Sequence, residues 1–107
     1  MEDPIITIHS TSTDWKNLGA TVFEPYDRHT IKVPFHLGEM HLDTFLRLKV
    51  EEITEDTIKF RGGDFNYYYE LKKGGGKVCV TYSVGGYTDH DGCDWDGTDY
   101  DYWLSWE

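Results

Sequence analysis

Hydrophobic and polar residues alternate along most of this chain, and a period of two is the spacing of side chains on a β-strand. The alternation is clearest from residue 42 onward. There Leu42 and every second residue to Val50 would share one face, while the residues between them are mostly charged. This pattern predicts one continuous strand over residues 42–51, with one face in a core and the other in water.

Shorter runs of β-branched, aromatic and alternating residues predict the other strands. The runs between residues 42 and 84 should form a four-strand antiparallel meander, whose last tight reversal is supplied by Gly74-Gly75-Gly76. Residues 20–23 and 30–33 flank a Pro-Tyr-Asp-Arg turn and should form a hairpin. The remaining strands are expected at residues 5–8 and 100–107, and at most one short helical turn is expected near residues 14–18.

The predicted fold is therefore all-β, with about eight short antiparallel strands in a single domain over residues 1–107. Two architectures fit this pattern, an up-and-down barrel and a compact sandwich. The barrel is slightly favoured, because consecutive hairpins form a meander and closure removes exposed sheet edges.

Charge is distributed unevenly over the 107 residues, whose formal net charge is −10. Residues 89–107 hold seven acidic residues and no lysine or arginine. Such a field would repel nucleic acid and anionic membranes, and would steer basic proteins or cations toward the C-terminal region. The sequence predicts no signal peptide and no membrane span, so a cytoplasmic protein is expected. In a reducing compartment Cys79 and Cys93 would stay thiols.

The acidic residues gather in the stretch TDHDGCDWDGTDYDYW, residues 88–103, where aromatic rings stand among them. Two Asp-Gly pairs favour turn conformations, so we expect an acidic aromatic loop at residues 85–99 that leads into the final strand. Carboxylates pair with Arg and Lys, and Trp and Tyr can supply buried anchors. The expected partner-binding residues are Asp89, Asp91, Asp94, Trp95, Asp96, Asp99, Tyr100, Asp101, Trp103 and Tyr68.

These residues predict a non-enzymatic acidic binding protein. Its expected role is that of an inhibitor or antagonist that occupies a basic groove of a partner protein, of the kind that binds nucleic acid. Carboxylates would then stand where phosphates sit, with no direct contact to nucleic acid or membrane. Replacing three of the aspartates by Asn should weaken such association.

Calcium offers a different use of the same cluster, since it takes six to eight oxygen ligands. An EF-hand loop begun at Asp89 would place Cys93, Asp94 and Tyr100 at positions where that motif needs other residues, so only a non-EF site fits. A calcium-binding β domain, which could be a carbohydrate-binding module, is the first alternative, and an Asp-metal hydrolase is the second. The metal ligands in either case would be Asp89, Asp91, Asp94, Asp96 and Asp99.

Other residues give weaker indications of chemistry. In an extended chain His36 and His41 would point to opposite sides, which disfavours a shared metal site. Cys93 lies among aspartates whose negative potential disfavours a nucleophilic thiolate, and no catalytic residue is predicted. Tyr68 should point outward between two inward tyrosines. If Tyr68 and Trp103 lay on one outer face, they would extend the acidic surface into an aromatic patch.

Overall fold

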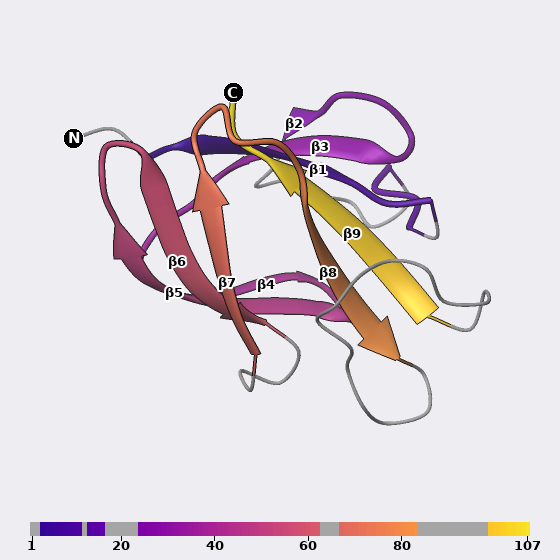
Figure 1. The fold of residues 1–107 in the computed structure, drawn as a ribbon. Coiled ribbons are helices and arrows are strands. Elements are labelled where there is room, and N and C mark those ends of the chain that lie inside the picture. The colour runs from indigo at the N-terminus through magenta and orange to yellow at the C-terminus, as the bar shows by residue number, and fades with distance from the viewer. Residues whose placement is uncertain (1–2, 12, 17–23, 63–66, 84–98) are drawn as a thin grey trace.

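The computed structural model describes residues 3–11, 13–16, 24–62, 67–83 and 99–107, and for residues 81–83, 99 and 100 it describes the backbone alone. The described residues form nine β-strands and no helix (Figure 1). Their bounds are β1 Ile5–His9, β2 Glu24–Pro25, β3 Thr30–Pro34, β4 Gly38–Asp43, β5 Leu46–Ile53, β6 Thr57–Gly62, β7 Tyr67–Lys72, β8 Val78–Ser83 and β9 Asp99–Ser105.

The strands form two antiparallel sheets. Sheet A has the order β2-β3-β1-β9-β8, and sheet B is the meander β4-β5-β6-β7. In sheet A the first and last long strands of the chain lie side by side, since Ile8 on β1 is paired with Leu104 on β9. The prediction of an all-β fold is therefore confirmed.

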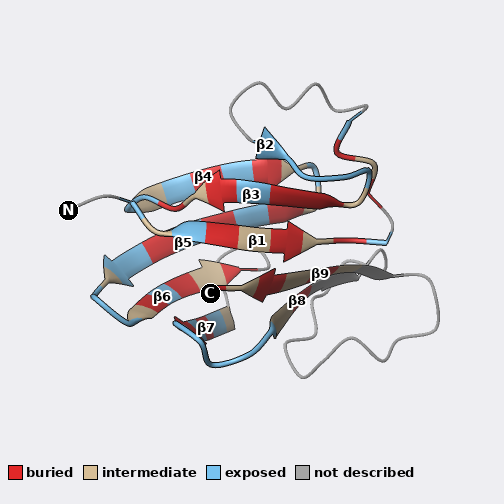
Figure 2. Cartoon of the chain, turned by 90° about the horizontal axis from the view of Figure 1, so that it is seen from above, coloured by how far each residue is buried: buried red, intermediate tan, exposed pale blue. Residues whose placement is uncertain are grey.

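The core lies between the two sheets, where most strands contribute every second side chain. Figure 2 shows this alternation as buried and exposed bands along the strands. Fully burying one aliphatic or aromatic side chain contributes about 1.5–3 kcal/mol, so the alternating positions supply most of the favourable free energy of folding. The fully buried side chains come from both sheets and from the segments beside them, and they include Ile6, Ile8, Trp15, Ile31, Phe35, Leu46, Leu48, Ile58, Phe60, Leu71, Tyr102 and Leu104.

The described residues form no closed barrel, which corrects the slight preference for that architecture. Closure would require β3 to pair with β4 and β7 to pair with β8, but each pair is split between the two sheets. At the first split, Pro34 cannot donate a backbone hydrogen bond, and the amide of Phe35 donates to the carbonyl of Pro4 at 2.9 Å. The sandwich, the other predicted architecture, describes the molecule.

A four-strand meander is present, but the prediction assigned the wrong strands to it. Its real strands are β4 to β7, and β8 crosses to sheet A beside β9. Gly74 and Gly76 have positive φ angles of 71° and 99°, in the region that only glycine adopts without strain. The Gly74 amide donates to the carbonyl of Trp106 at 2.7 Å. The glycine segment thus carries the chain between sheets and does not close a hairpin.

The stretch predicted as one strand from residue 42 to residue 51 is two strands joined by a turn at Thr44 and Phe45. The pairing shifts register between His41 and Asp43, which is a β-bulge. The bulge lets Leu42 stay buried while Asp43 turns toward sheet A, so the alternation of hydrophobic residues continues through the turn. Hydrophobic spacing alone could not locate this break.

The other predicted elements are present in altered form. The predicted hairpin contains β3, but its first strand is only Glu24–Pro25, and residues 20–23 lie outside the described part of the chain. A turn occurs at Trp15 and Lys16, within the range predicted for one helical turn. The final strand is confirmed as β9, which buries Tyr102 and Leu104 on its inner face, and Trp106 just after the strand is buried too.

Candidate functional site

The predicted acidic loop joins two strands that are neighbours in sheet A. Ser83 at the end of β8 is paired with Asp99 at the start of β9, so residues 84–98 leave and re-enter the sheet at one point. The end of β1 at His9 and the start of β3 at Thr30 lie at this same end of sheet A. We call it the acidic end. Five of the predicted site residues, Asp89, Asp91, Asp94, Trp95 and Asp96, lie outside the described residues.

The predicted site residues of β9 occupy the strand in order. Asp99 and Tyr100 are paired with Ser83 and Tyr82, and the structure describes only their backbone. Asp101 and Trp103 follow on the outer face of the sheet, both half-buried. The part of the predicted site that the structure describes in sheet A is therefore the outer face of β9. This strand directly follows residues 84–98 in the chain, which we call the acidic connection.

Trp103 lies within a row of side chains that crosses sheet A. Its neighbour on β1 is His9, with ring centroids 6.1 Å apart, and its neighbour on β8 is Cys79. Two neighbouring strands thus flank the indole, which is half-buried. A half-buried ring of this kind can anchor a contact with a partner at little cost in side-chain entropy.

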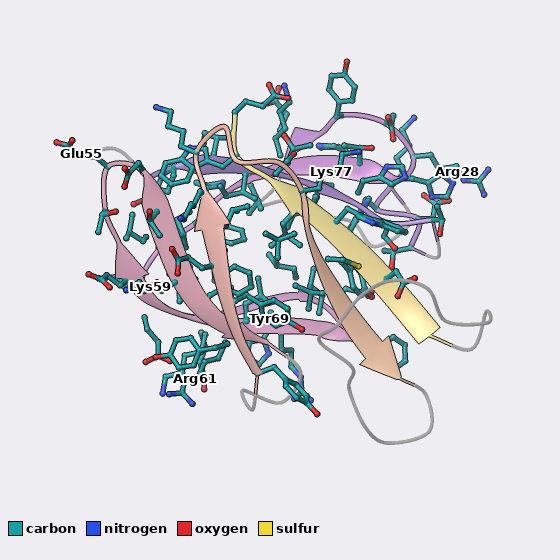
Figure 3. The ribbon with its side chains drawn as sticks, viewed as in Figure 1. Arg28, Glu55, Lys59, Arg61, Tyr69 and Lys77 are labelled. Carbon is teal, nitrogen blue, oxygen red and sulfur yellow. The ribbon has the colours of Figure 1, made fainter. Side chains whose placement is uncertain are left out.

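Tyr68 lies on β7 in sheet B and does not share a face with Trp103. Its side chain is 58% exposed, and the guanidinium of Arg61 sits 4.4 Å from its ring centroid. Arg61 also pairs with Glu51 across the sheet. Figure 3 shows Arg61 and Lys59 projecting from sheet B, far from Arg28 at the other side of the molecule. Tyr68 and Trp103 therefore do not form the aromatic patch that was expected if both rings lay on one outer face.

A carboxylate that the sequence analysis did not single out ties the acidic end together. Asp43 Oδ2 accepts hydrogen bonds from the hydroxyl of Tyr102 and, at 2.9 Å, from the hydroxyl of Thr13. Its other carboxylate oxygen, Oδ1, accepts a hydrogen bond from the backbone amide of Thr44 at 2.7 Å. Tyr102 is fully buried, and its ring packs against Trp15 at 6.2 Å. The cluster joins β9 of sheet A to β4 of sheet B.

The period-two pattern hid Asp43, because it placed this residue on the wet face of a continuous strand. The indication that could have found it is a polar residue directly before a short Thr-Phe turn, where bulges are common.

Imidazole side chains lie at the acidic end on the side of β1 and β3. His9 Nδ1 lies 2.9 Å from the hydroxyl of Thr30, and the rings of His9 and His29 meet edge to face at 6.4 Å. The backbone amide of His29 donates to Asp27 at 2.8 Å, and this hydrogen bond is the main reason that the pKa of Asp27 is lowered. The Thr30 hydrogen bonds and the nearby His9 add to the lowering.

Cys79 is disulfide-bonded, so the prediction that both cysteines stay thiols is wrong. The chain has one other cysteine, Cys93, which lies in the connection outside the described residues. Disulfides persist in oxidising compartments and are rare in the cytoplasm. This bond therefore weakens the basis for the cytoplasmic expectation. The described residues contain no helix, and so none long and apolar enough to cross a membrane.

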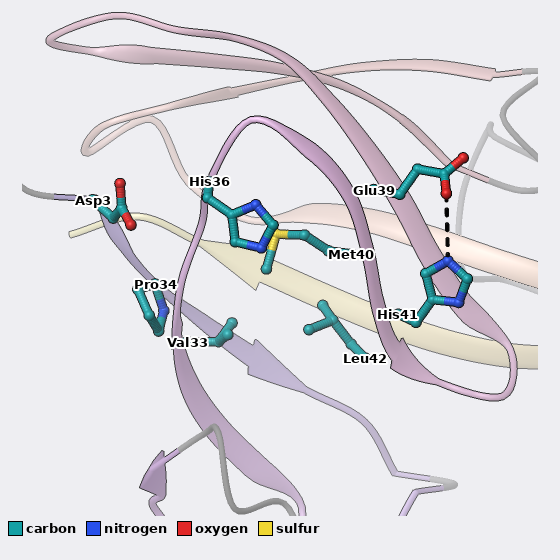
Figure 4. A pocket seen from close by; sticks show the side chains of 8 residues that line it. All are labelled: Asp3, Val33, Pro34, His36, Glu39, Met40, His41 and Leu42. Carbon is teal, nitrogen blue, oxygen red and sulfur yellow. Dashed lines mark ion pairs between the residues drawn. The ribbon is translucent and has the colours of Figure 1, made fainter.

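His36 and His41 both line a pocket of about 250 Å³ between β3 and β4 (Figure 4). His36 lies in the connection before β4, where the chain is not extended, and its Nδ1 lies 2.9 Å from the carbonyl of Leu37. His41 Nε2 lies 3.8 Å from Glu39 Oε2. Within the described ranges no three His, Cys, Asp or Glu side chains are grouped to hold a metal ion.

The fold and these contacts define a two-sheet, all-β protein with an acidic end. No protein-family model, curated protein or solved structure matches the chain.

Proposed function

We propose that this protein is a non-enzymatic acidic binding protein whose acidic end occupies a basic groove of a partner protein. The observation that carries the proposal is the pairing of Ser83 with Asp99, which returns both ends of the acidic connection to one point of a rigid sheet. Asp101 and Trp103 continue the same surface along β9.

Electrostatic attraction and shape each contribute to the proposed binding. The last lysine or arginine of the chain is Lys77, so β8, the connection and β9 carry no basic side chain except that of His90. Clustered charge of one sign raises association rates with an oppositely charged groove. Because the acidic end would occupy the groove, binding would block the groove against nucleic acid.

The test compares two variants that remove the same charge from different places. Asp89→Asn/Asp91→Asn/Asp94→Asn neutralises the acidic connection, and Glu24→Gln/Glu55→Gln/Glu107→Gln neutralises three exposed carboxylates elsewhere. Each would be used to capture proteins from a nuclease-treated extract, followed by elution with duplex DNA or RNA. We expect the wild type and the control to retain a basic protein that nucleic acid displaces, and the first variant to lose it.

Equal capture by all three proteins, or capture that nucleic acid cannot displace, would contradict the proposal. The salt dependence gives a second readout, because an interface that depends on the aspartates weakens steeply with ionic strength. The variant lacking three aspartates should show a flatter dependence than the matched control.

The disulfide at Cys79 favours a second candidate, a calcium-binding β domain that works in an oxidising compartment. Millimolar calcium should then raise the free energy of unfolding by about 2.7 kcal/mol at a hundred times the dissociation constant. Thermal unfolding in calcium, in magnesium and in EDTA would measure this. Identical midpoints in all three would leave the basic partner as the remaining function.

A further inference from the structure

Strand β4 is one of the two outer strands of sheet B, and the described residues place β5 on one side of it and no strand on the other. Outer strands present backbone N–H and C=O groups that another strand can pair with. The adjacent pocket of about 250 Å³ is lined on the inner side by Val33, Met40 and Leu42 (Figure 4). The strand thus offers a row of hydrogen-bonding groups next to an apolar hollow.

We propose that β4 pairs antiparallel with β4 of a second copy of this chain, centred on Met40, so that the two four-stranded sheets join into one. A two-fold axis through Met40 places Met40 opposite the partner's Met40, and Glu39 opposite the partner's His41. The argument rests on the order of residues in β4 and does not depend on the proposed function.

On the outer face this register places a carboxylate opposite an imidazole at two positions. Glu39 and His41 are both exposed and point to the same side of the strand. An imidazole N–H can donate to a carboxylate whether or not the ring is charged. Cross-strand pairs of this kind stabilise a sheet, and like charges directly opposite destabilise it. Each Glu39 would meet one His41 of the other copy.

Neighbouring symmetric registers lack this match. Centring the pair on His41 would set His41 against the partner's His41 and Glu39 against the partner's Asp43. Centring it on Glu39 would set two carboxylates against each other. Residues two apart point to the same face of a strand, so in both of these registers the like groups would meet on one face of the joined sheet. Charge therefore selects the register centred on Met40.

On the inner face the same register fills space that the single chain leaves open. The partner's Met40 would enter the pocket beside Met40 and Leu42, and a thioether side chain adapts to an irregular apolar hollow. Gly38 would stand opposite the partner's Leu42. A Cβ built on Gly38 meets nothing within 4 Å, so that position has room for the leucine.

The test measures the oligomeric state by sedimentation velocity from about 1 to about 500 μM, a range that covers the weak affinity expected of a small interface. We expect a dimer that Glu39→Lys weakens about tenfold, since lysine would face the partner's imidazole. His41→Glu should have a similar effect. The exchange Glu39→His/His41→Glu should restore the wild-type dimer within about threefold, because it recreates both pairs.

Glu24→Lys on β2 is the matched control, because it makes the same charge change on another exposed strand. Circular dichroism of each variant would confirm that it is folded. A wild-type monomer at all concentrations would overturn the proposal, as would a dimer that neither Glu39→Lys nor His41→Glu weakens. A monomer that binds a synthetic peptide of residues 37–43 would make the edge a peptide site and would also overturn the dimer.

Discussion

The two ends of the sandwich are held together by different kinds of hydrogen bond. At the acidic end the sheets are joined through side chains, with the Asp43 carboxylate accepting from Tyr102 and Thr13. At the opposite end, which we call the terminal end because the C-terminus lies there (Figure 1), a backbone hydrogen bond makes the link. The amide of Gly74, which follows β7 of sheet B, donates to the carbonyl of Trp106, which follows β9 of sheet A, at 2.7 Å.

The difference has a consequence for how sequence controls each end. Backbone hydrogen bonds can form with almost any side chain, so the terminal end depends mainly on residues that permit its turn geometry. A half-buried carboxylate with two hydroxyl donors cannot be replaced so freely, because each donor left behind loses this acceptor. The acidic end should therefore be the more sensitive to single polar substitutions.

Reduction of the disulfide should give the largest loss of stability. A crosslink that closes a loop of about 15 residues contributes roughly 3 kcal/mol by restricting the unfolded chain. Urea unfolding with and without dithiothreitol should show this loss in the wild type. The variant Cys79→Ser/Cys93→Ser should be as unstable as the reduced protein and should not respond to reductant. Equal midpoints for oxidised and reduced wild type would contradict the expectation.

Asp43→Ala should lower the free energy of unfolding by about 2–3 kcal/mol, because it strands the fully buried Tyr102 hydroxyl without its acceptor. Tyr102→Phe should cost about 1 kcal/mol, since Asp43 keeps its bonds to Thr13 and Thr44. Chemical denaturation would measure both. If the tyrosine change cost more than the aspartate change, the carboxylate would not be the centre of the cluster.

Gly76→Ala probes the terminal end and should cost about 1–2 kcal/mol, because its φ of 99° is strained for a residue with a Cβ. The space around Gly76 is open, so the loss would come from the backbone and not from a steric clash. Lys77→Ala, at the next position, is the control and should change the unfolding midpoint little. A neutral Gly76→Ala would mean that the turn adopts another conformation.

The smallest effect concerns the lowered pKa of Asp27. A carboxyl whose pKa is lower in the folded state stabilises the fold above its ordinary pKa of about 3.9, and this contribution is lost as the pH falls through the folded value. Asp27→Asn should therefore flatten the decline of unfolding free energy below about pH 4. An unchanged slope in Asp27→Asn would contradict the assignment.

The local pattern predicted side-chain faces better than it predicted strand ends. Tyr69 is buried and Tyr68 exposed on β7, as the alternation indicated, and the inner face of β9 is as predicted. The same alternation failed at Thr44 and Phe45, since the bulge before the turn kept leucines in phase on both strands. Hydrophobic spacing indicates which face of a strand a residue occupies. It does not detect a turn that keeps the hydrophobic residues of both strands in phase.

The candidate site was only partly predictable. The acidic stretch and its position before the final strand follow from composition, and β9 begins at Asp99, one residue before the predicted start of that strand at Tyr100. The contribution of Asp43 and Thr13 did not follow, because they lie far from Tyr102 in the sequence and meet it only after the sheets have packed. The use of the aspartates remains a proposal, which the capture and calcium experiments test.

The sequence by itself determined that the protein is all-β, which described residues of β7 and β9 point inward, and that negative charge gathers near the C-terminus. These properties depend on neighbouring residues and on the fixed two-residue period of a strand. Only the tertiary structure decided which strands share a sheet, how β8 crosses from the meander to β9, and that Asp43 reaches Tyr102. Those choices depend on contacts between distant segments, which compete in free energy through packing and turn geometry and leave no mark on local spacing.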